Sequence, residues 1–499
     1  MRKVLCSIPL IASLLLFTIG IAEAQEGEKV TIVLPEEPHN LEPGYVGLDV
    51  LRVNANIVEA LVTRDPITGE VVPELATSWE RIDEHTWLFK LRENVTFHNG
   101  EPFNAEAAAF AINRVVDPEL NFHVRSALVA MEARAVDDYT LEIVTEEPEP
   151  ILLKHLYWAR IPAPEATRNS PDKELRSPVG TGPYMLDSWD GGIRLVLQAN
   201  PEYWGGAPEI ETVEFVWRAE SSVRTAMVQT EEADIAVAIA PQDTGKTKVL
   251  DVTIPETTFL RMDVPSTPLN DIRIRRAINY AIDKEGLAAS IFGGYAEAAG
   301  QLITPDVTGY NPDLEPWPYD PEEARQLIQE AKTDGVPIDQ EITLFGRIGI
   351  YPNAIETMEA ISSMLNEVGL NTTVQMLEIN AWVDVTLANP VPEDRHGIIQ
   401  SSHGNETGDA VFTVEGYYTT DGPQSPNSDP RVDELNDVAQ TLEGEARDEA
   451  YQEILKYVRQ NIVSNVPLVH LRVLYAVTDD LIWNPRPDNL ILVKDMSLE

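Results

Sequence analysis

SPVGTGPYMLDSWDGGIRLVLQANPEYWGGAPEI, residues 177–210, is the stretch that decides the fold. Prolines and glycines crowd residues 178–183, so the chain takes a sharply shaped turn with exposed backbone there. Residues 184–186 begin a strand, Asp-Gly-Gly at 190–192 indicates a hairpin, and the apolar run 193–197 returns as a second strand. By themselves, these residues predict a strand, a hairpin and a strand, followed by an aromatic-rich loop.

The same residues carry a family resemblance. PVGTGPY at 178–184, a hairpin and NPEYWGGAP at 200–208 together resemble the signature of the family 5 extracellular solute-binding proteins, the peptide-binding components of ATP-binding-cassette (ABC) importers. Further segments resemble the same family in the same order: VTFHNGEPFNA at 95–105, PLNDIRIRRAINYAIDK at 268–284, YDPEEAR at 319–325 and PNSDPRVDEL at 426–435. The resemblance therefore covers nearly all of the chain beyond its first residues.

The resemblance implies an α/β fold of two lobes, like that of periplasmic binding proteins, with an extra subdomain in lobe one. We expect lobe one at 25–262 with the subdomain at about 60–170, lobe two at 263–474, and a return to lobe one at 475–499. The residues of lobe two agree with an α/β arrangement. A strand at 341–345, an amphipathic helix from Asn353 and a strand at 371–377 follow one another with short links, which predicts a parallel βαβ unit.

The first residues are typical of an export signal. Arg2 and Lys3 precede a mostly apolar run at 4–21, and Ala22-Glu23-Ala24 supplies a small-x-small cleavage site. The alternative is a membrane anchor. We expect a periplasmic protein cleaved after Ala24. The single cysteine, Cys6, lies at the beginning of the apolar run and not after it, so we expect neither a lipoprotein anchor nor disulfides.

The net charge of −45 bounds the partners of this chain. Such a surface repels nucleic acid and anionic lipid, so neither is an expected partner. The acidity could favour cationic ligands, or it could be a solvated surface suited to a salty medium.

Two stretches suggest binding residues without reference to any family. Glu37 and His39 lie in a polar loop directly after the apolar strand 29–34, and open α/β folds bind ligands at such strand ends. Either residue could instead be an ordinary solvated loop residue. Arg261 interrupts the apolar strand 257–263, so its side chain either snorkels at a sheet edge or faces the cleft.

Other candidate residues follow only from the resemblance. Dipeptide-binding members of the family hold the free amine with an Asp in a W-x-G-D-x-G-D-P loop, and they hold the carboxylate with an Arg two residues before a Tyr. Here the loop reads HGNETGDA from His403, which replaces the tryptophan, and Glu406 falls at the amine-binding position. Arg347 lies four residues before Tyr351, not two. These departures argue against a strict dipeptide specificity. An ammonium and a carboxylate buried in a closing cleft would nevertheless need side chains of opposite charge.

Three more residues are candidates in the same region. Asn405 lies in the loop and is expected to contact the ligand. Asp409 could contact the ligand or could stabilise the loop through backbone N–H groups. Trp382 could stack on the ligand or pack at the hinge.

Enzyme signals are weak. No G-x-S-x-G, P-loop or H-E-x-x-H pattern occurs. The eight histidines have no metal-ligand spacing, although nickel-binding relatives exist, and chance carboxylate pairs are plentiful in so acidic a chain. We therefore expect no catalytic residue and no cofactor. The expected function is a monomeric protein that captures a short peptide or peptide-like solute and delivers it to an ABC permease and its ATPase. The alternatives are a ligand sensor for a receptor and a secreted hydrolase.

Overall fold

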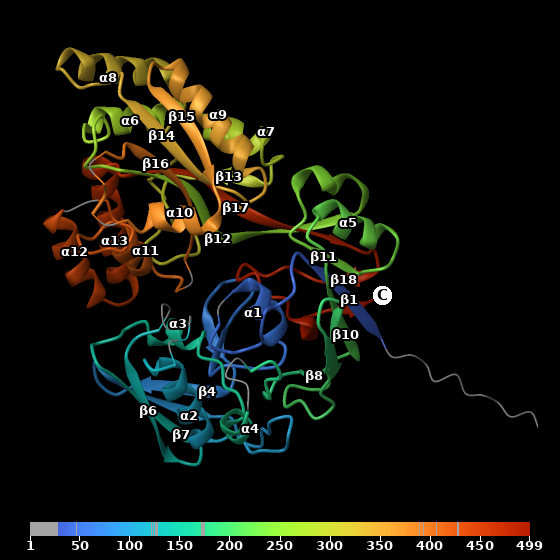
Figure 1. Cartoon of the computed structure of the whole chain (residues 1–499). Coiled ribbons are helices and arrows are strands. Elements are labelled where there is room, and N and C mark those ends of the chain that lie inside the picture. The colour runs from blue at the N-terminus through green and yellow to red at the C-terminus, as the bar shows by residue number, and fades with distance from the viewer. Residues whose placement is uncertain are drawn as a thin grey trace, which may run out of the picture.

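The computed structural model describes residues 28–499, except residues 46, 121, 123, 125–127, 171–174, 389, 393, 406 and 427–428. The export signal predicted at 1–24 lies outside the described residues. Figure 1 shows two bodies, which we call lobe one and lobe two, joined by the long strands β12 (Lys248–Met262) and β17 (Asn465–Val477). Within the described part of the chain, no helix combines the length and the apolar character that crossing a membrane requires.

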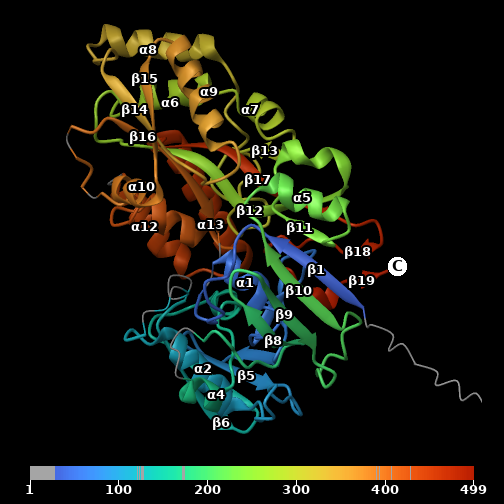
Figure 2. The same cartoon turned by 45° about the vertical axis from the view of Figure 1, so that its right-hand side comes forward.

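One eleven-stranded mixed sheet runs through both lobes in the order β15-β14-β16-β12-β17-β11-β1-β10-β9-β8, with β13 paired to β17. Its other strands are β1 (Lys29–Leu34), β8 (Tyr184–Asp190), β9 (Arg194–Ala199), β10 (Thr212–Trp217), β11 (Ile235–Val237), β13 (Ala296–Ala298), β14 (Glu341–Arg347), β15 (Asn371–Leu377) and β16 (Gly397–Gly404). Figure 2 shows β1, β10, β9 and β8 side by side in lobe one. The α/β prediction is confirmed.

The predicted hairpin is present as β8 and β9, which pair antiparallel across Gly191 and Gly192. The turn before it explains the glycines of the signature. A Cβ on Gly180 would lie 1.9 Å from the carbonyl oxygen of Ile57, so only glycine lets the two backbones approach. This stretch therefore joins the edge of the sheet to the turn at residues 55–57, which follows helix α1 (Leu48–Asn54).

The aromatic loop after β9 converges with that turn on one buried carboxylate. Glu59 is 1% exposed and accepts hydrogen bonds from the hydroxyls of Thr181 and Tyr203, each at 2.7 Å, and from the indole of Trp204 at 2.9 Å. Both halves of the signature stretch thus bind the same residue. Glu59 therefore links the two segments that lie on either side of the hairpin.

Lobe one carries a smaller sheet of its own, in the order β4-β5-β7-β6. Helix α2 packs on this sheet, and its N-cap Asn104 accepts from the N–H of Ala107 at 2.9 Å. The strands here and in two further pairs are β2 (Val62–Arg64), β3 (Val71–Pro73), β4 (Ala76–Arg81), β5 (Thr86–Leu91), β6 (Met131–Asp137), β7 (Thr140–Thr145), β18 (Leu481–Ile482) and β19 (Ser497–Leu498).

Helices cover the sheets in both lobes. Those of lobe one are α1 (Leu48–Asn54), α2 (Ala105–Val116), α3 (Leu152–Leu156), α4 (Pro164–Asn169) and α5 (Ser221–Gln229). Those of lobe two are α6 (Ile272–Ala281), α7 (Lys284–Ser290), α8 (Pro321–Thr333), α9 (Ala354–Glu367), α10 (Ile379–Thr386), α11 (Ala410–Tyr417), α12 (Pro430–Gln440) and α13 (Gly444–Tyr457). The parallel βαβ unit predicted in lobe two is confirmed as β14, α9 and β15.

The crossing between lobes lies within the long strands. Strand β12 pairs with lobe two's β16 from Glu256 onward, and its pairing with β17 shifts register between Thr253 and Thr257. Strand β17 pairs with lobe one's β11 through residues 475–477. Strand β12 therefore gains β16 as a second partner before the boundary predicted at residue 263, and one continuous strand passes between the lobes. The boundary itself stays a prediction.

Candidate functional site

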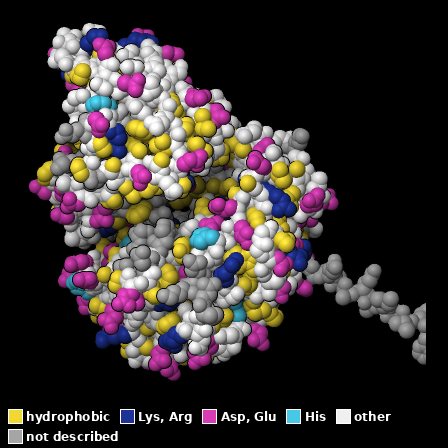
Figure 3. Space-filling view, viewed as in Figure 1, with side chains coloured by type: hydrophobic (Ala, Val, Ile, Leu, Met, Phe, Trp, Pro, Cys, Tyr) yellow, Lys and Arg dark blue, Asp and Glu magenta, His cyan; other side chains and the backbone are white. Residues whose placement is uncertain are grey.

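A hollow separates the two lobes on the face shown in Figure 3, and apolar side chains gather along it. The topology explains why polar groups meet there. Strands β14 and β16 are parallel, and β12 runs antiparallel to β16. The ends of β14 and β16 and the lobe-two start of β12 therefore share one edge, which is where open α/β sheets bind ligands. We call this edge the cleft wall of lobe two.

Arg347 and Trp382 form the first part of this wall. The guanidinium of Arg347, at the end of β14, lies 5.5 Å from the ring of Trp382 on α10. Trp382 donates its indole N–H to the carbonyl oxygen of Gln400 at 2.8 Å, and the side-chain oxygen of Gln400 accepts from the backbone N–H of Arg347 at 3.0 Å. Gln400 on β16 therefore orients both candidates.

Tyr351 lies behind this group and not in front of it. It is 5% exposed, and its hydroxyl accepts from the side chain of Gln400 at 2.6 Å. Burial raises the pKa of Tyr351, so its hydroxyl stays neutral. The structure thus gives Tyr351 a role in supporting Gln400, and its direct contact with a ligand stays a prediction.

A carboxylate that the sequence analysis missed lies beside this group. Glu256 on β12 is half-buried, and its carboxylate accepts a hydrogen bond from the hydroxyl of Ser402. Burial raises the pKa of Glu256, although the Ser402 hydroxyl and the charge of Arg347 oppose this effect. No local pattern marks a single Glu in so acidic a chain.

The loop after β16 is built from buried polar side chains. His403 is 4% exposed, shares a hydrogen bond with Thr413 at 2.7 Å, and lies against the rings of Phe412 and Tyr417. Burial lowers the pKa of His403 to about 3. His403 is therefore a neutral, buried residue with protein partners, and its contact with a ligand stays a prediction.

Asn405 and Asp409 close the same loop upon itself. The amide of Asn405 donates to the carbonyl oxygen of Asp409 at 2.9 Å and to Thr413 at 3.0 Å. Asp409 has no exposed surface, caps α11 through the N–H of Val411 at 3.1 Å, and pairs with both ends of the Arg447 guanidinium at 2.9 and 3.0 Å. The side chains of Asn405 and Asp409 thus stabilise the loop, in accord with the second role weighed for Asp409. Glu406 lies outside the described residues.

The remaining candidates have partners of their own. Glu37 accepts from the indole of Trp189 at 2.9 Å and from the N–H of Gly192 at 3.0 Å, which ties the first loop to the β8–β9 hairpin. His39 is exposed and lies 2.7 Å from a carboxylate oxygen of Asp49.

Arg261 is neither at a sheet edge nor open to solvent. Strand β12 lies between β16 and β17, and Arg261 is 3% exposed and donates to the carbonyl oxygen of Gln424 at 3.2 Å. Burial lowers the pKa of Arg261 to about 10. The alternative of snorkelling at an edge is therefore wrong.

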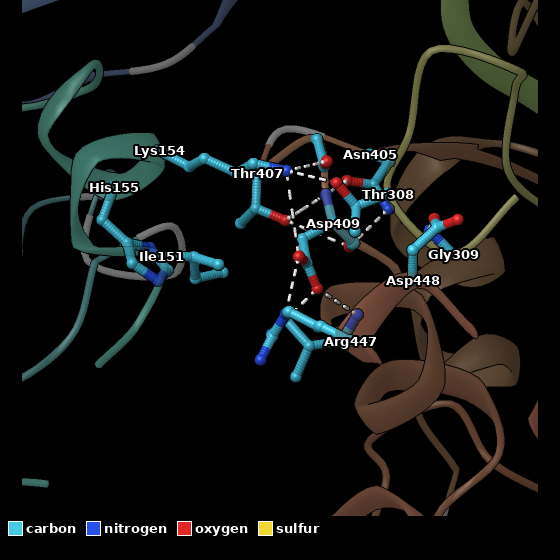
Figure 4. A network of polar contacts seen from close by, with 12 residues as sticks. Ile151, Lys154, His155, Thr308, Gly309, Asn405, Thr407, Asp409, Arg447 and Asp448 are labelled. Atoms are coloured by element: carbon cyan, nitrogen blue, oxygen red, sulfur yellow. Dashed lines mark hydrogen bonds and ion pairs between the residues drawn. The ribbon is translucent and has the colours of Figure 1, made fainter. Parts of the chain in front are cut away.

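The two lobes touch across the hollow through Lys154. Its ammonium, on α3 of lobe one, donates to the hydroxyl of Thr308 at 2.7 Å and to the carbonyl oxygen of Gly408 at 2.6 Å, both in lobe two (Figure 4). Asp409 lies 3.8 Å from the same ammonium. A cavity of about 300 Å³ adjoins this contact and is lined from both lobes, including Arg64 and Asn405.

Among the described residues, no group of three or more His, Cys, Asp and Glu side chains is placed to hold a metal ion. His39, His403 and His470, the histidines weighed for a metal site, have separate partners: Asp49, Thr413 and Thr257. The cleft wall instead presents one guanidinium, one carboxylate and one indole, a set suited to recognising a small polar solute.

Comparison with known proteins gives a consistent result. The family model described as "Bacterial extracellular solute-binding proteins, family 5 Middle" matches residues 70–425. The chain is 29% identical over 344 residues to the dipeptide-binding protein of Escherichia coli, covering 62% of this chain and 64% of that protein. It is 29% identical over 454 residues to a glutathione-binding protein of Pectobacterium atrosepticum, covering 86% of each.

Solved structures of other proteins have a similar fold over nearly the whole chain. An ABC transporter substrate-binding protein of Listeria monocytogenes superposes with a TM-score of 0.85 at 20% identity, covering 95% of this chain and 99% of that one. A Brucella suis protein crystallised with Fe(III)-EDTA gives a TM-score of 0.81 at 23% identity, over 94% of this chain and 100% of that one. At these identities the likeness concerns the fold alone.

Proposed function

Because the chain belongs to family 5 of the bacterial extracellular solute-binding proteins, we propose that it captures a short peptide or peptide-like solute between its lobes and delivers it to an ABC importer. The observation that carries this proposal is the hollow between two lobes joined by β12 and β17, with Arg347, Trp382 and Glu256 on one wall. Proteins of this architecture bind by hinge closure. A ligand shifts the open–closed equilibrium by its preference for the closed state.

The peptide class is supported by the relatives, two of which are named for binding a dipeptide and glutathione. We propose further that the protein is exported with cleavage after Ala24, that it acts as a monomer, and that a permease with its ATPase receives the solute. The matched relatives are named as binding proteins and not as enzymes, which supports a role without turnover.

Thermal unfolding against a ligand panel tests the function. The panel comprises alanine peptides of two to five residues, glutathione, opines, oligosaccharides and nickel chelates. A ligand at 100 times its Kd stabilises the folded state by about 2.7 kcal/mol, which raises the melting temperature measurably. A shift with peptides supports the proposal. A shift with oligosaccharides or chelates alone would keep the binding role and overturn the peptide class.

A further inference from the structure

Glu256 lies where the chain passes from one lobe to the other. It is the first residue of β12 that pairs with lobe two, opposite Gly404, and it falls inside the register shift between Thr253 and Thr257. The preceding carbonyl oxygen, of Pro255, accepts from the N–H of Asn405 at 2.8 Å. The backbone around Glu256 is thus held against the loop after β16, which places a carboxylate at the hinge end of the cleft wall.

The Glu256 carboxylate has unused capacity to accept hydrogen bonds. An ionised carboxylate offers about four acceptor positions. In the described part of the chain, Ser402 alone donates to it, and no Lys, Arg or His forms an ion pair with it. Burial of a carboxylate with so few partners is unfavourable, and it raises the pKa of Glu256. A cationic group of a ligand would supply the hydrogen-bond donors and the positive charge that the Glu256 carboxylate lacks.

Arg347 is a cation that likewise has unused hydrogen-bonding capacity. Its Nε atom is buried, finds no hydrogen-bond acceptor among the described residues, and belongs to a guanidinium that lies over Trp382. No described carboxylate forms an ion pair with Arg347. The charge of Arg347 nevertheless acts on Glu256, so the two groups share one region without neutralising each other by contact.

The geometry points to Glu256 as a ligand-contacting residue that receives the cationic group of the solute. The assignment rests on the proposed function and refines it, because it selects solutes with a free ammonium or guanidinium group next to the hinge strand β12. It places the cation on the hinge strand, in addition to any contact made by the loop residue Glu406. A solute that lacks the cation leaves Glu256 desolvated and unpaired, which lowers affinity.

The test compares Glu256→Gln with the wild-type protein by isothermal titration calorimetry. The probes are alanine peptides of two to five residues, each with a free amino terminus and in its N-acetylated form. The Gln side chain keeps the shape and can still accept from Ser402, so the fold should survive. The matched control is Glu359→Gln, which removes the same charge from the exposed face of α9 in the same lobe.

We expect Glu256→Gln to weaken binding of the free-amine peptides at least ten-fold and to leave the N-acetylated forms unchanged, while Glu359→Gln changes neither. Equal loss for both forms would make Glu256 a structural residue, and no loss would make it a bystander; either result overturns the assignment. If Glu256→Gln unfolds, Glu256→Asp keeps the charge but withdraws the carboxylate from the ligand, so it must show a smaller loss that is again confined to the free-amine peptides. Wild-type protein that binds none of the peptides would instead contradict the proposed peptide function.

Discussion

The ammonium group of Lys154 donates to the carbonyl oxygen of Gly408 at 2.6 Å, which joins lobe one to the loop that follows β16 in lobe two. Gly408 directly precedes Asp409, whose buried carboxylate lies 3.8 Å from the same ammonium and is held by Arg447. The Lys154 ammonium of lobe one therefore binds acceptor oxygens of lobe two that Arg447 helps to hold in place. Such a contact can exist only when the lobes are close.

Lys154→Met should shift the ligand-free protein toward more open conformations. Charge-assisted hydrogen bonds contribute about 1.5–3 kcal/mol each, so losing two of them would change the open–closed equilibrium by roughly 100-fold or more. Small-angle X-ray scattering should show a larger radius of gyration for the variant. Lys332→Met, at an exposed lysine of α8, is the control. Identical scattering curves for Lys154→Met and wild type would argue against an interlobe latch.

Arg447→Ala should be strongly destabilising. The Arg447–Asp409 pair is almost completely buried, with 4% and 0% of the two side chains exposed. Removing one partner of a buried pair leaves an uncompensated charge, which costs about 3–5 kcal/mol of unfolding free energy. Urea denaturation would measure this loss. Arg431→Ala, which breaks an exposed pair with Glu434, should cost less than about 1 kcal/mol. Equal losses for both variants would refute the structural role of Asp409.

Glu74→Gln should change how stability depends on pH. Burial, with the charge of Glu59 adding to it, raises the pKa of Glu74 to about 7 from an ordinary value of 4.5. Between pH 4.5 and 7, Glu74 is therefore protonated in the folded state and ionised in the unfolded state. The contribution of Glu74 to the free energy of unfolding is complete below pH 4.5 and is lost as the pH rises to 7. Melting temperatures between pH 4.5 and 8 should fall less steeply for Glu74→Gln than for wild type. The exposed Glu80→Gln serves as control, and parallel curves for all three proteins would contradict the prediction.

His403→Gln should make the free energy of unfolding less sensitive to acid. Burial lowers the pKa of His403 to about 3 from its ordinary value of 6.5. Between these two pH values His403 is protonated in the unfolded state and neutral in the folded state. The stability that depends on neutral His403 is complete above pH 6.5 and is lost as the pH falls toward 3. The variant will lose packing against Phe412 and Tyr417, so the informative quantity is the slope of unfolding free energy between pH 6.5 and 4. A slope unchanged from wild type would contradict this explanation.

Several features followed from local sequence. The hairpin of β8 and β9 was predictable because Asp-Gly-Gly turns and alternating strand residues are local signals. The βαβ unit of β14, α9 and β15 was predictable because its period changes from two to 3.6 and back across short links. Family membership followed from several motifs in register, and the family model confirms it.

The side-chain environments of the candidate site were less predictable. The motif positions of His403, Asp409 and Tyr351 suggested that they contact the ligand. In the structure all three side chains are buried and form hydrogen bonds with other protein side chains. Arg347 and Trp382 lie together on the cleft wall, and their role toward the ligand stays a prediction, as do those of Glu37, His39 and Glu406.

By itself, the sequence determined the local elements, since turn residues and periodicity act over a few neighbouring residues. Its motifs identified the family, and the two-lobed α/β class followed from that resemblance. Only the tertiary structure decided which charges are paired and which are free. Ser402 donates to Glu256 across 146 residues of chain, and Arg447 reaches Asp409 across 38. Charge pairing depends on distance in space and on exclusion of water, neither of which a linear spacing records.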